Sequence, residues 1–273
     1  MFLTDYHIHS TCSDDGHNTM LEMVLASYEK GVRQLCFTDH CDIDHFLTGK
    51  PNPDCFCIRK RMLEMYKSTL AAVPEDMKVF LGLELGEGNH DPDEAMKIAR
   101  SEELDFVLGS IHNLKGKPDF YETKYSGDDR SQALVDNYMK ELIELSLIDC
   151  FDVMAHIGYP SRYIRKGGGR VEISTRTYLE ALTVLFKNLI ERGKGIEINC
   201  SGFRTPPGGG PLPALDVLRL YKGLGGEIIT VGSDAHRVTN AGVGLPEGFD
   251  ILRDLGYKYV TVFEKRKPSF LKI

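Results

Sequence analysis

Short apolar runs alternate with amphipathic stretches along the chain. Residues 3–9 are predicted to form the first strand, in which alternation places the polar side chains of Asp5, His7 and His9 on one face. The following stretch, residues 19–31, has apolar residues at helical spacing and ends in a glycine. The chain is therefore predicted to begin with a strand followed by a helix.

The same unit recurs to the end of the sequence. Further apolar runs predict strands at 32–40, 78–85, 105–112, 151–156, 195–199, 227–233 and 257–263. Helical spacing between them predicts helices near 59–73, 92–102, 130–148, 175–192, 212–223 and 246–255. Alternating strands and helices indicate parallel βαβ units. Seven or eight such units without a linker predict an α/β fold in which residues 1–273 form a single barrel domain.

The composition indicates which binding partners and which cellular compartment to expect for the protein. The chain has 33 Lys and Arg against 40 Asp and Glu, a formal net charge of −7, so we expect no nucleic-acid or membrane partner. The first residues lack the pattern of a secretory signal, and no apolar run approaches the roughly 18 residues of a membrane span. Seven scattered cysteines suit reduced thiols better than a disulfide framework. We therefore expect a cytoplasmic protein.

Histidines and carboxylates gather where predicted strands end. These residues are His7, His9, His40, Glu84, His112, His156, Asp234 and His236. In a parallel barrel the carboxyl ends of all strands face one mouth, so we expect these side chains to converge although they are far apart in sequence. Converging imidazoles and carboxylates are typical of a divalent metal site, and the ligand types suit zinc, iron and manganese alike.

Several assignments stay open at this level. Either Asp14 or Asp15 can be a ligand, and Glu87 is a weaker rival of Glu84. We assign no role to the remaining histidines, which are His17, His45 and His90. An amidohydrolase also uses HxH in a barrel, but it usually needs a lysine ligand at a strand end, which no predicted strand supplies. A third possibility is a non-catalytic metal-binding module. Such a module would be expected to have lost one or more metal ligands, whereas this sequence keeps the full set of candidates.

The motifs together resemble the polymerase-and-histidinol-phosphatase (PHP) superfamily. They are DYHIHS at 5–10, FTDH at 37–40, GLE at 82–84, GSIH at 109–112, MAHIG at 154–158 and GSDAH at 232–236. The resemblance implies a distorted (β/α)7 barrel, similar to a TIM barrel, with two or three metal ions at the carboxyl ends of its strands. One ion would be held by His7, His9, Glu84 and Asp234. A second would be held by Asp15, His40 and His236, and a third by Glu84, His112 and His156.

Within the superfamily the chain is most similar to the stand-alone histidinol-phosphate phosphatases. That resemblance implies hydrolysis of L-histidinol phosphate, a small phosphate monoester, by attack of a metal-bridging hydroxide. Arg162 and Arg204 would bind the phosphate, and the catalytic residues would be Arg162, Asp234 and His236. The alternative is another PHP phosphoesterase that acts on a nucleotide or another small phosphate ester.

Two features of the expected site rest on its loops. The cationic end of such a substrate would pair with carboxylates near the mouth, for which Asp14, Asp42 and Asp44 are the candidates. If the backbone stays extended past the last barrel strand, Asp234 and His236 both face the mouth. The sequence leaves the metal identity and the oligomeric state open.

Overall fold

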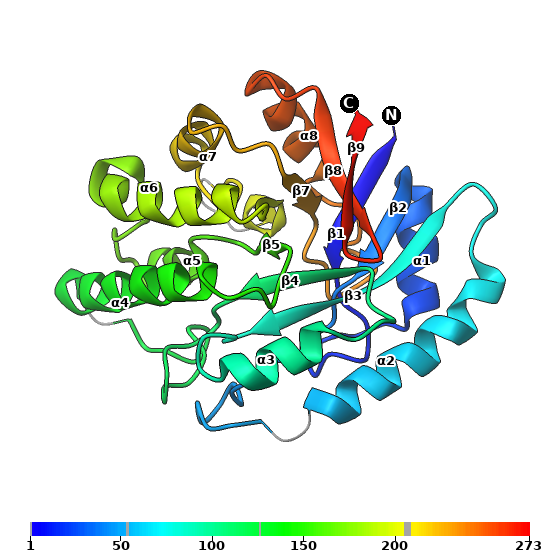
Figure 1. Ribbon diagram of the computed structural model, residues 1–273, viewed down its shortest axis with the longest axis horizontal. Helices are drawn as coiled ribbons and strands as arrows, with labels where there is room; N and C mark the ends of the chain where they lie inside the picture. The colour runs from blue at the N-terminus through cyan, green and yellow to red at the C-terminus, as the bar shows by residue number, and fades with distance from the viewer. Residues whose placement is uncertain (1, 53–54, 126, 205–208) are drawn as a thin grey trace.

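Seven parallel strands form a nearly closed barrel in the part of the chain that the structure describes, residues 2–52, 55–125, 127–204 and 209–273 of this computed structural model (Figure 1). Each strand pairs with the next along the chain, in the order β1 (Leu3–Ile8), β2 (Val32–Phe37), β3 (Lys78–Gly86), β4 (Phe106–Ser110), β5 (Val153–Met154), β6 (Gly195–Asn199) and β7 (Ile229–Gly232).

The two ends of the sheet meet just beyond β7. The backbone N–H of Asp234 donates to the carbonyl of His7 at 2.7 Å, and the N–H of His9 donates to the carbonyl of Ala235 at 3.0 Å. These two hydrogen bonds join the end of β1 to the segment after β7, so the first and last strands of the barrel are neighbours. The prediction of a distorted seven-stranded α/β barrel is confirmed.

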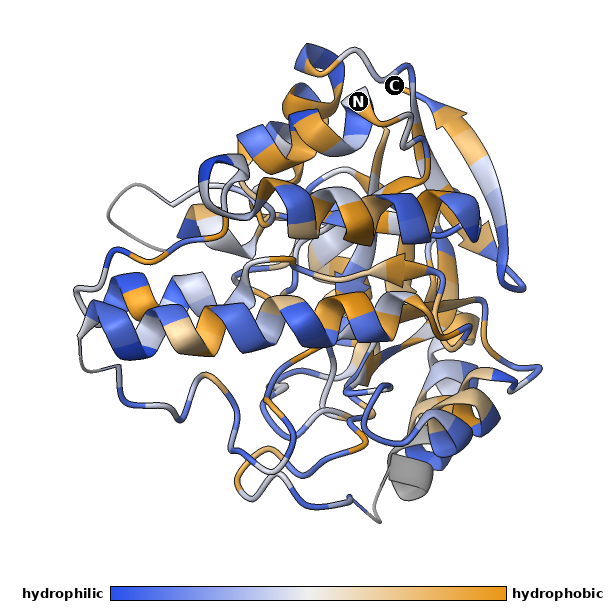
Figure 2. Cartoon of the chain, turned by 60° about the vertical axis from the view of Figure 1, so that its left-hand side comes forward, coloured by the Kyte–Doolittle hydropathy of each residue, from blue (hydrophilic) through white to orange (hydrophobic). Residues whose placement is uncertain are grey.

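Helices cover the outside of the barrel. They are α1 (Met20–Glu29), α2 (Cys55–Thr69), α3 (Pro92–Ala99), α4 (Asp128–Ser146), α5 (Tyr159–Lys166), α6 (Thr175–Glu191), α7 (Leu215–Gly223) and α8 (Leu245–Asp254). Local signals fix their starts: Thr19 and Glu22 form a reciprocal capping box on α1. Figure 2 shows hydrophobic residues on the strands and on the helix faces that turn toward them. Burial of these apolar faces stabilises the packing of the helices on the outside of the sheet.

An apolar floor closes the barrel below the carboxyl ends of its strands. Phe80 precedes Glu84 by four residues on β3, so both side chains leave the same face of the strand. The ring of Phe106 packs between Tyr6 and Phe263, with centroid distances of 5.4 and 4.9 Å. The Tyr6 hydroxyl donates to the carbonyl of Phe263 at 3.0 Å. Open space for a functional site is thus left at the opposite end of the barrel.

Two elements differ from the sequence prediction. The run at 257–263 contains β8 (Tyr259–Glu264), which forms an antiparallel hairpin with β9 (Lys267–Lys272) and adds no strand to the barrel. Lys265 and Arg266 form its turn with positive φ, a conformation that hydrophobic spacing does not signal. Helix α5 was not predicted, because Ile164 is the one aliphatic residue in YPSRYIRK and the segment therefore shows no apolar periodicity.

The expectation that the cysteines are reduced is wrong at Cys41, which is disulfide-bonded. Cys12, Cys36, Cys150 and Cys200 are free and buried. Pairing depends on which loops the fold brings together, and spacing in the sequence does not reveal it. Among the described helices, none has both the length and the apolar character that crossing a bilayer requires.

Candidate functional site

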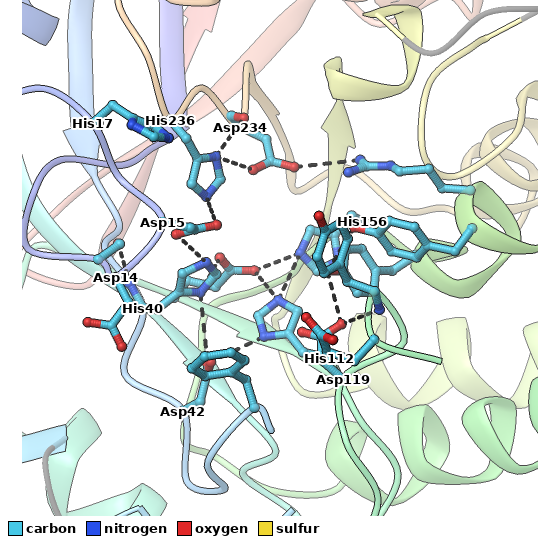
Figure 3. Close-up of a pocket in the computed structure, with 18 of the residues that line it drawn as sticks. Asp14, Asp15, His17, His40, Asp42, His112, Asp119, His156, Asp234 and His236 are labelled. Carbon is cyan, nitrogen blue, oxygen red and sulfur yellow. Dashed lines mark hydrogen bonds and ion pairs between the residues drawn. The ribbon is translucent and has the colours of Figure 1, made fainter. Parts of the chain in front are cut away.

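A cavity of about 560 Å³ opens at the carboxyl ends of the barrel strands. Its wall includes most of the residues singled out from the sequence, namely Asp15, His40, Glu84, His112, His156, Arg162, Arg204, Asp234 and His236. His7 and His9 are fully buried at the end of β1, and their Nε2 atoms lie 3.1 and 3.5 Å from Glu84 of the cavity wall. In Figure 3 the labelled side chains among them converge on one space: Asp15, His40, His112, His156, Asp234 and His236. The fold therefore brings together the residues that were predicted to converge at the carboxyl ends of the strands.

The first group of candidate ligands surrounds the end of β1. Nε2 of His7 and Nε2 of His9 are 3.0 Å apart. Oε2 of Glu84 lies 3.1 Å from the first and 3.5 Å from the second. Oδ1 of Asp234 lies 3.8 and 3.6 Å from the same two nitrogens. Two imidazole nitrogens and two carboxylate oxygens thus face one point, as a metal ion requires.

The second group lies at the mouth of the cavity. Nε2 of His236 is 3.1 Å from Oδ2 of Asp15, and Nε2 of His40 is 3.8 Å from Oδ1 of the same carboxylate. The rings of His9 and His236 stack with centroids 3.9 Å apart. Asp14 is exposed and forms no ion pair with a histidine among the residues described. The geometry therefore favours Asp15 over Asp14.

Glu84 joins the first group to a third one. Its Oε1 lies 2.6 Å from Nε2 of His156 and 3.0 Å from Nε2 of His112. Its Oε2 faces His7, His9 and, at 3.2 Å, Nδ1 of His40. Oε1 of the rival Glu87 accepts the backbone N–H of His112 at 2.7 Å and lies 3.9 Å from Nδ1 of that ring, and no contact of Glu87 with a second histidine ring is seen among the described residues. Glu84 is therefore the carboxylate that can bridge ions.

The donor atoms fit divalent metal ions. Several buried ring nitrogens form no hydrogen bond in the described structure: Nδ1 of His40, His112 and His156 and Nε2 of His236. Three of them, those of His40, His112 and His236, have a carboxylate oxygen at 3.2, 3.4 and 3.1 Å without hydrogen-bond geometry. A buried nitrogen without a partner is costly, and a cation would satisfy one that faces the cavity. Groups of three donors within 4.8 Å of one another include His7–His9–Glu84 and His9–His40–His236. Imidazole and carboxylate donors together suit zinc, iron or manganese.

Charge pairing shapes the protonation of this cluster. Burial alone would lower the pKa of His7, but the carboxylates of Glu197 and Glu84 raise it well above its usual value. Burial would raise the pKa of Asp234, yet His7, His236 and Arg162 hold it well below its usual range. The cluster therefore contains closely spaced opposite charges, which a metal ion would replace with metal–ligand bonds.

Two arginines border the cluster. Nη2 of Arg162, on α5, lies 3.7 Å from Oδ2 of Asp234 and also donates to the hydroxyl of Ser201. Arg204 donates to the carbonyl of Ser233 at 2.7 Å and to that of Asp234 at 2.9 Å. Both guanidinium groups line the cavity, although Arg204 is held more firmly by the backbone.

The backbone at Asp234 corrects one expectation. Its φ of +53° is left-handed, so the chain is not extended between Asp234 and His236. Both side chains still reach the cavity, and Nδ1 of His236 lies 3.6 Å from Oδ1 of Asp234. The turn is compatible with Asp because short polar side chains tolerate this conformation.

Sequence reasoning missed residues that hold the candidate ligands in place. Oε1 of Glu197, on β6, lies 2.8 Å from Nδ1 of His7, and Oε2 accepts the backbone N–H of His156 at 2.9 Å. Asp39 accepts hydrogen bonds from the backbone and hydroxyl groups of Ser10 and Ser13. A charged residue inside a buried apolar strand, as in GIEIN, is the signal that could have found Glu197.

The acidic loop residues named from the sequence as candidates for the cationic end of a substrate, Asp14, Asp42 and Asp44, all line the cavity. Asp44 pairs with Nδ1 of His90 at 2.8 Å, and Nε2 of that ring pairs with Glu141 at 2.7 Å, so His90 has a structural contact. Asp42 faces Nδ1 of His112 at 3.4 Å. Asp119 also lines the cavity and was not singled out from the sequence.

Comparisons with known proteins find relatives along nearly the whole chain. The model of the PHP domain family matches residues 5–201. A probable histidinol-phosphatase of Clostridium acetobutylicum is 28% identical over 97% of this chain and 98% of its own. A histidinol-phosphatase of Lactococcus lactis is 24% identical over 96% and 95% of the two chains. A crystal structure of histidinol phosphate phosphatase from that organism, with zinc, L-histidinol and phosphate, has a TM-score of 0.77 at 20% identity and covers 98% and 100% of the two chains.

Proposed function

Because the chain belongs to the PHP domain family, we propose that it is a metal-dependent phosphatase that hydrolyses L-histidinol phosphate to L-histidinol and inorganic phosphate, a step of histidine biosynthesis in the cytoplasm. The observation that carries this proposal is the bridging position of Glu84 between two sets of histidines, with Arg162 beside Asp234 at the cavity wall. Full-length relatives that bear the name histidinol-phosphatase support the choice of substrate.

The metal ligands are assigned in three sets. His7, His9, Glu84 and Asp234 would hold one ion, and Asp15, His40 and His236 a second. His112 and His156 would hold a third together with Glu84. Divalent ions at these positions supply Lewis-acid chemistry, since they lower the pKa of bound water and neutralise phosphate oxygens.

The arginines orient the phosphate. Arg162 lies beside Asp234, and its Nε has no hydrogen-bond partner among the described atoms, so the guanidinium has donors left for a phosphate oxygen. Arg204 approaches from the turn after β6 and uses two of its nitrogens to hold the 233–234 backbone. It would add positive charge to the same end of the cavity.

Asp234 is the proton carrier of the proposed mechanism. Its Oδ1 faces the histidines, while its Oδ2 faces Arg162 and accepts from Nδ2 of Asn199 at 3.3 Å. In direct hydrolysis, water forms a bond to phosphorus and loses a proton, and the bond from phosphorus to the alkyl oxygen breaks. Oδ2 of Asp234 would receive that proton and return it to the leaving alkoxide, with His236 supporting the carboxylate. No protein nucleophile is required.

The test is an assay of purified protein with L-histidinol phosphate against a panel of nucleotides and small phosphate esters. We expect the highest kcat/KM with L-histidinol phosphate, loss of activity with chelator and recovery on return of zinc, iron or manganese. A higher kcat/KM with a nucleotide would contradict L-histidinol phosphate as the substrate and favour the alternative, a PHP phosphoesterase that acts on nucleotides. Full activity of metal-free protein would overturn the metal-dependent mechanism.

A further inference from the structure

The cavity has two walls of opposite character. Arg162 and Arg204 border one end, where Asp234 also lies. The loops after β2 and β4 form the other wall, which contains Phe46, Tyr121 and the carboxylate of Asp119. Figure 3 shows Asp119 beside His112, away from Asp234. A molecule that fills the cavity therefore meets positive charge at one end and an aromatic, acidic surface at the other.

Asp119 is a carboxylate in this wall that lacks a cation. Its Oδ1 accepts the backbone N–H of Tyr121 at 2.6 Å and the hydroxyl of Tyr159 at 3.3 Å. None of the ion pairs formed by the described residues includes it, and burial raises its pKa to about 6 despite the charge of His112. A carboxylate that is still mostly ionised at pH 7 in such surroundings is stabilised by a cation that enters the cavity.

The neighbouring acids are already engaged. Asp44 is paired with the His90 ring at 2.8 Å. Asp42 lies 3.4 Å from Nδ1 of His112 and 3.9 Å from Nδ1 of His40. Both carboxylates therefore lie within ion-pair distance of protein imidazoles, whereas no ion pair among the described residues includes Asp119.

The position of Asp119 relative to the candidate metal ligands is fixed. Its backbone N–H donates to the carbonyl of Phe46 at 2.7 Å, and the N–H of the next residue, Phe120, donates to the carbonyl of His112 at 2.9 Å. The Tyr159 ring packs on His112 and His156 with centroid distances of 5.3 and 5.0 Å. These contacts hold the Asp119 carboxylate beside the candidate metal ligands, so the loop does not have to move for both to contact one substrate.

We propose that Asp119 binds a protonated nitrogen of the substrate, an ammonium or imidazolium group, while the phosphate lies between the metal ligands and Arg162. This inference rests on the proposed function and adds to it a rule of selectivity: the site prefers phosphate monoesters that carry a cationic group on the alcohol. Aromatic side chains around the carboxylate suit a flat cationic ring as well as an amine. Asp119 is thus a specificity-determining residue.

The variant Asp119→Asn tests the proposal, because the amide oxygen can still accept from Tyr121 and Tyr159 while the charge is lost. A charge-assisted hydrogen bond contributes enough that kcat/KM for L-histidinol phosphate should fall about tenfold or more. The fall should lie mainly in KM. For n-butyl phosphate, which has no basic nitrogen, kcat/KM should stay within about twofold. The variant Asp119→Glu, which restores the charge, should recover part of the loss.

Binding of L-histidinol, which has no phosphate, separates this inference from the proposed function. Calorimetry with metal-loaded protein should show binding to the wild type that Asp119→Asn weakens about tenfold. The exposed Glu102→Gln, on the loop before β4, is the matched control and should change neither measurement. Equal losses on both esters, or unchanged L-histidinol binding, would overturn the role of Asp119. Asp119-dependent binding of L-histidinol without hydrolysis of its phosphate would instead overturn the proposed function alone.

Discussion

Oε1 of Glu197 lies 2.8 Å from Nδ1 of His7, and both side chains are fully buried. The second oxygen of the same carboxylate accepts the backbone N–H of His156 at 2.9 Å. One residue on β6 thus orients a candidate ligand on β1 and anchors another that follows β5. An imidazole held at Nδ1 presents Nε2 to a metal, and the carboxylate raises the basicity of that nitrogen.

Glu197→Gln should therefore weaken metal binding without unfolding the barrel. The neutral amide keeps the size of the side chain but cannot accept at both oxygen positions. We expect an affinity loss of about tenfold to 100-fold for the metal that depends on His7. Metal titration and the rise of Tm on metal addition measure the effect. Glu264→Gln on β8 is exposed and should behave as wild type, whereas unchanged metal affinity in Glu197→Gln would contradict this role.

Residues at regular strand ends were the predictable part of the site. His7, His9 and Glu84 follow from alternation and from the shared mouth of parallel strands, both of which are local rules. Asp119 was not predictable, because it lies in a loop whose path depends on contacts with Phe46 and Tyr159. The left-handed turn at Asp234 is invisible to hydrophobic spacing for the same reason, since strand-to-loop geometry is set by the tertiary fold.

Replacing His9 with Ala should remove metal and activity together. His9 contributes a ring nitrogen to two of the three-donor groups and is one of the four ligands proposed for the first ion. We expect a fall in kcat by orders of magnitude and a lower metal content, with far-UV circular dichroism unchanged. His17, an exposed histidine at the cavity wall that belongs to none of the three-donor groups, supplies the matched His17→Ala control. Wild-type activity in metal-depleted His9→Ala would exclude the metal centre.

Replacing Arg162 and replacing Arg204 should have different effects on Tm. Arg162→Met removes a guanidinium that has donors left for substrate, so kcat/KM should fall about tenfold or more while Tm changes little. Arg204→Met should lower kcat/KM and also Tm, because the carbonyls of Ser233 and Asp234 lose a shared charged donor. Steady-state kinetics and thermal melts of both variants check this. Equal Tm values for the two variants would contradict the anchoring role of Arg204.

The buried pair of contacts at His90 predicts a pH-dependent stability. Burial would lower the pKa of His90, but hydrogen bonds and charge from Glu141 and Asp44 raise it above its usual value. A raised folded pKa means that the stabilisation is complete below the unfolded pKa near 6.5 and is lost as pH rises through the folded value. Lys115, whose Nζ donates to the His90 carbonyl at 3.1 Å, adds positive charge nearby that the two carboxylates outweigh.

His90→Gln should thus be destabilised most at acidic to neutral pH. Breaking a buried ion pair costs about 3–5 kcal/mol when one partner is removed. The difference in unfolding free energy from wild type should be near that size at pH 6 and shrink toward pH 9. Urea unfolding at both pH values measures it. A difference that stays constant with pH would show that His90 is not protonated in the folded protein.

Asp234→Asn separates a catalytic carboxylate from one that only shapes a turn. Asn tolerates the left-handed φ of +53° as well as Asp does, so the backbone should be preserved and Tm should change little. If Asp234 only held the turn, kcat would stay near normal. As a proton carrier whose Oδ2 faces Arg162, its replacement should cut kcat by roughly two orders of magnitude. Because His7, His9 and Glu84 remain, most of the metal should be retained, which distinguishes a chemical defect from metal loss. Measuring kcat, metal content and Tm on this one variant decides the question, and a normal kcat would remove Asp234 from the mechanism.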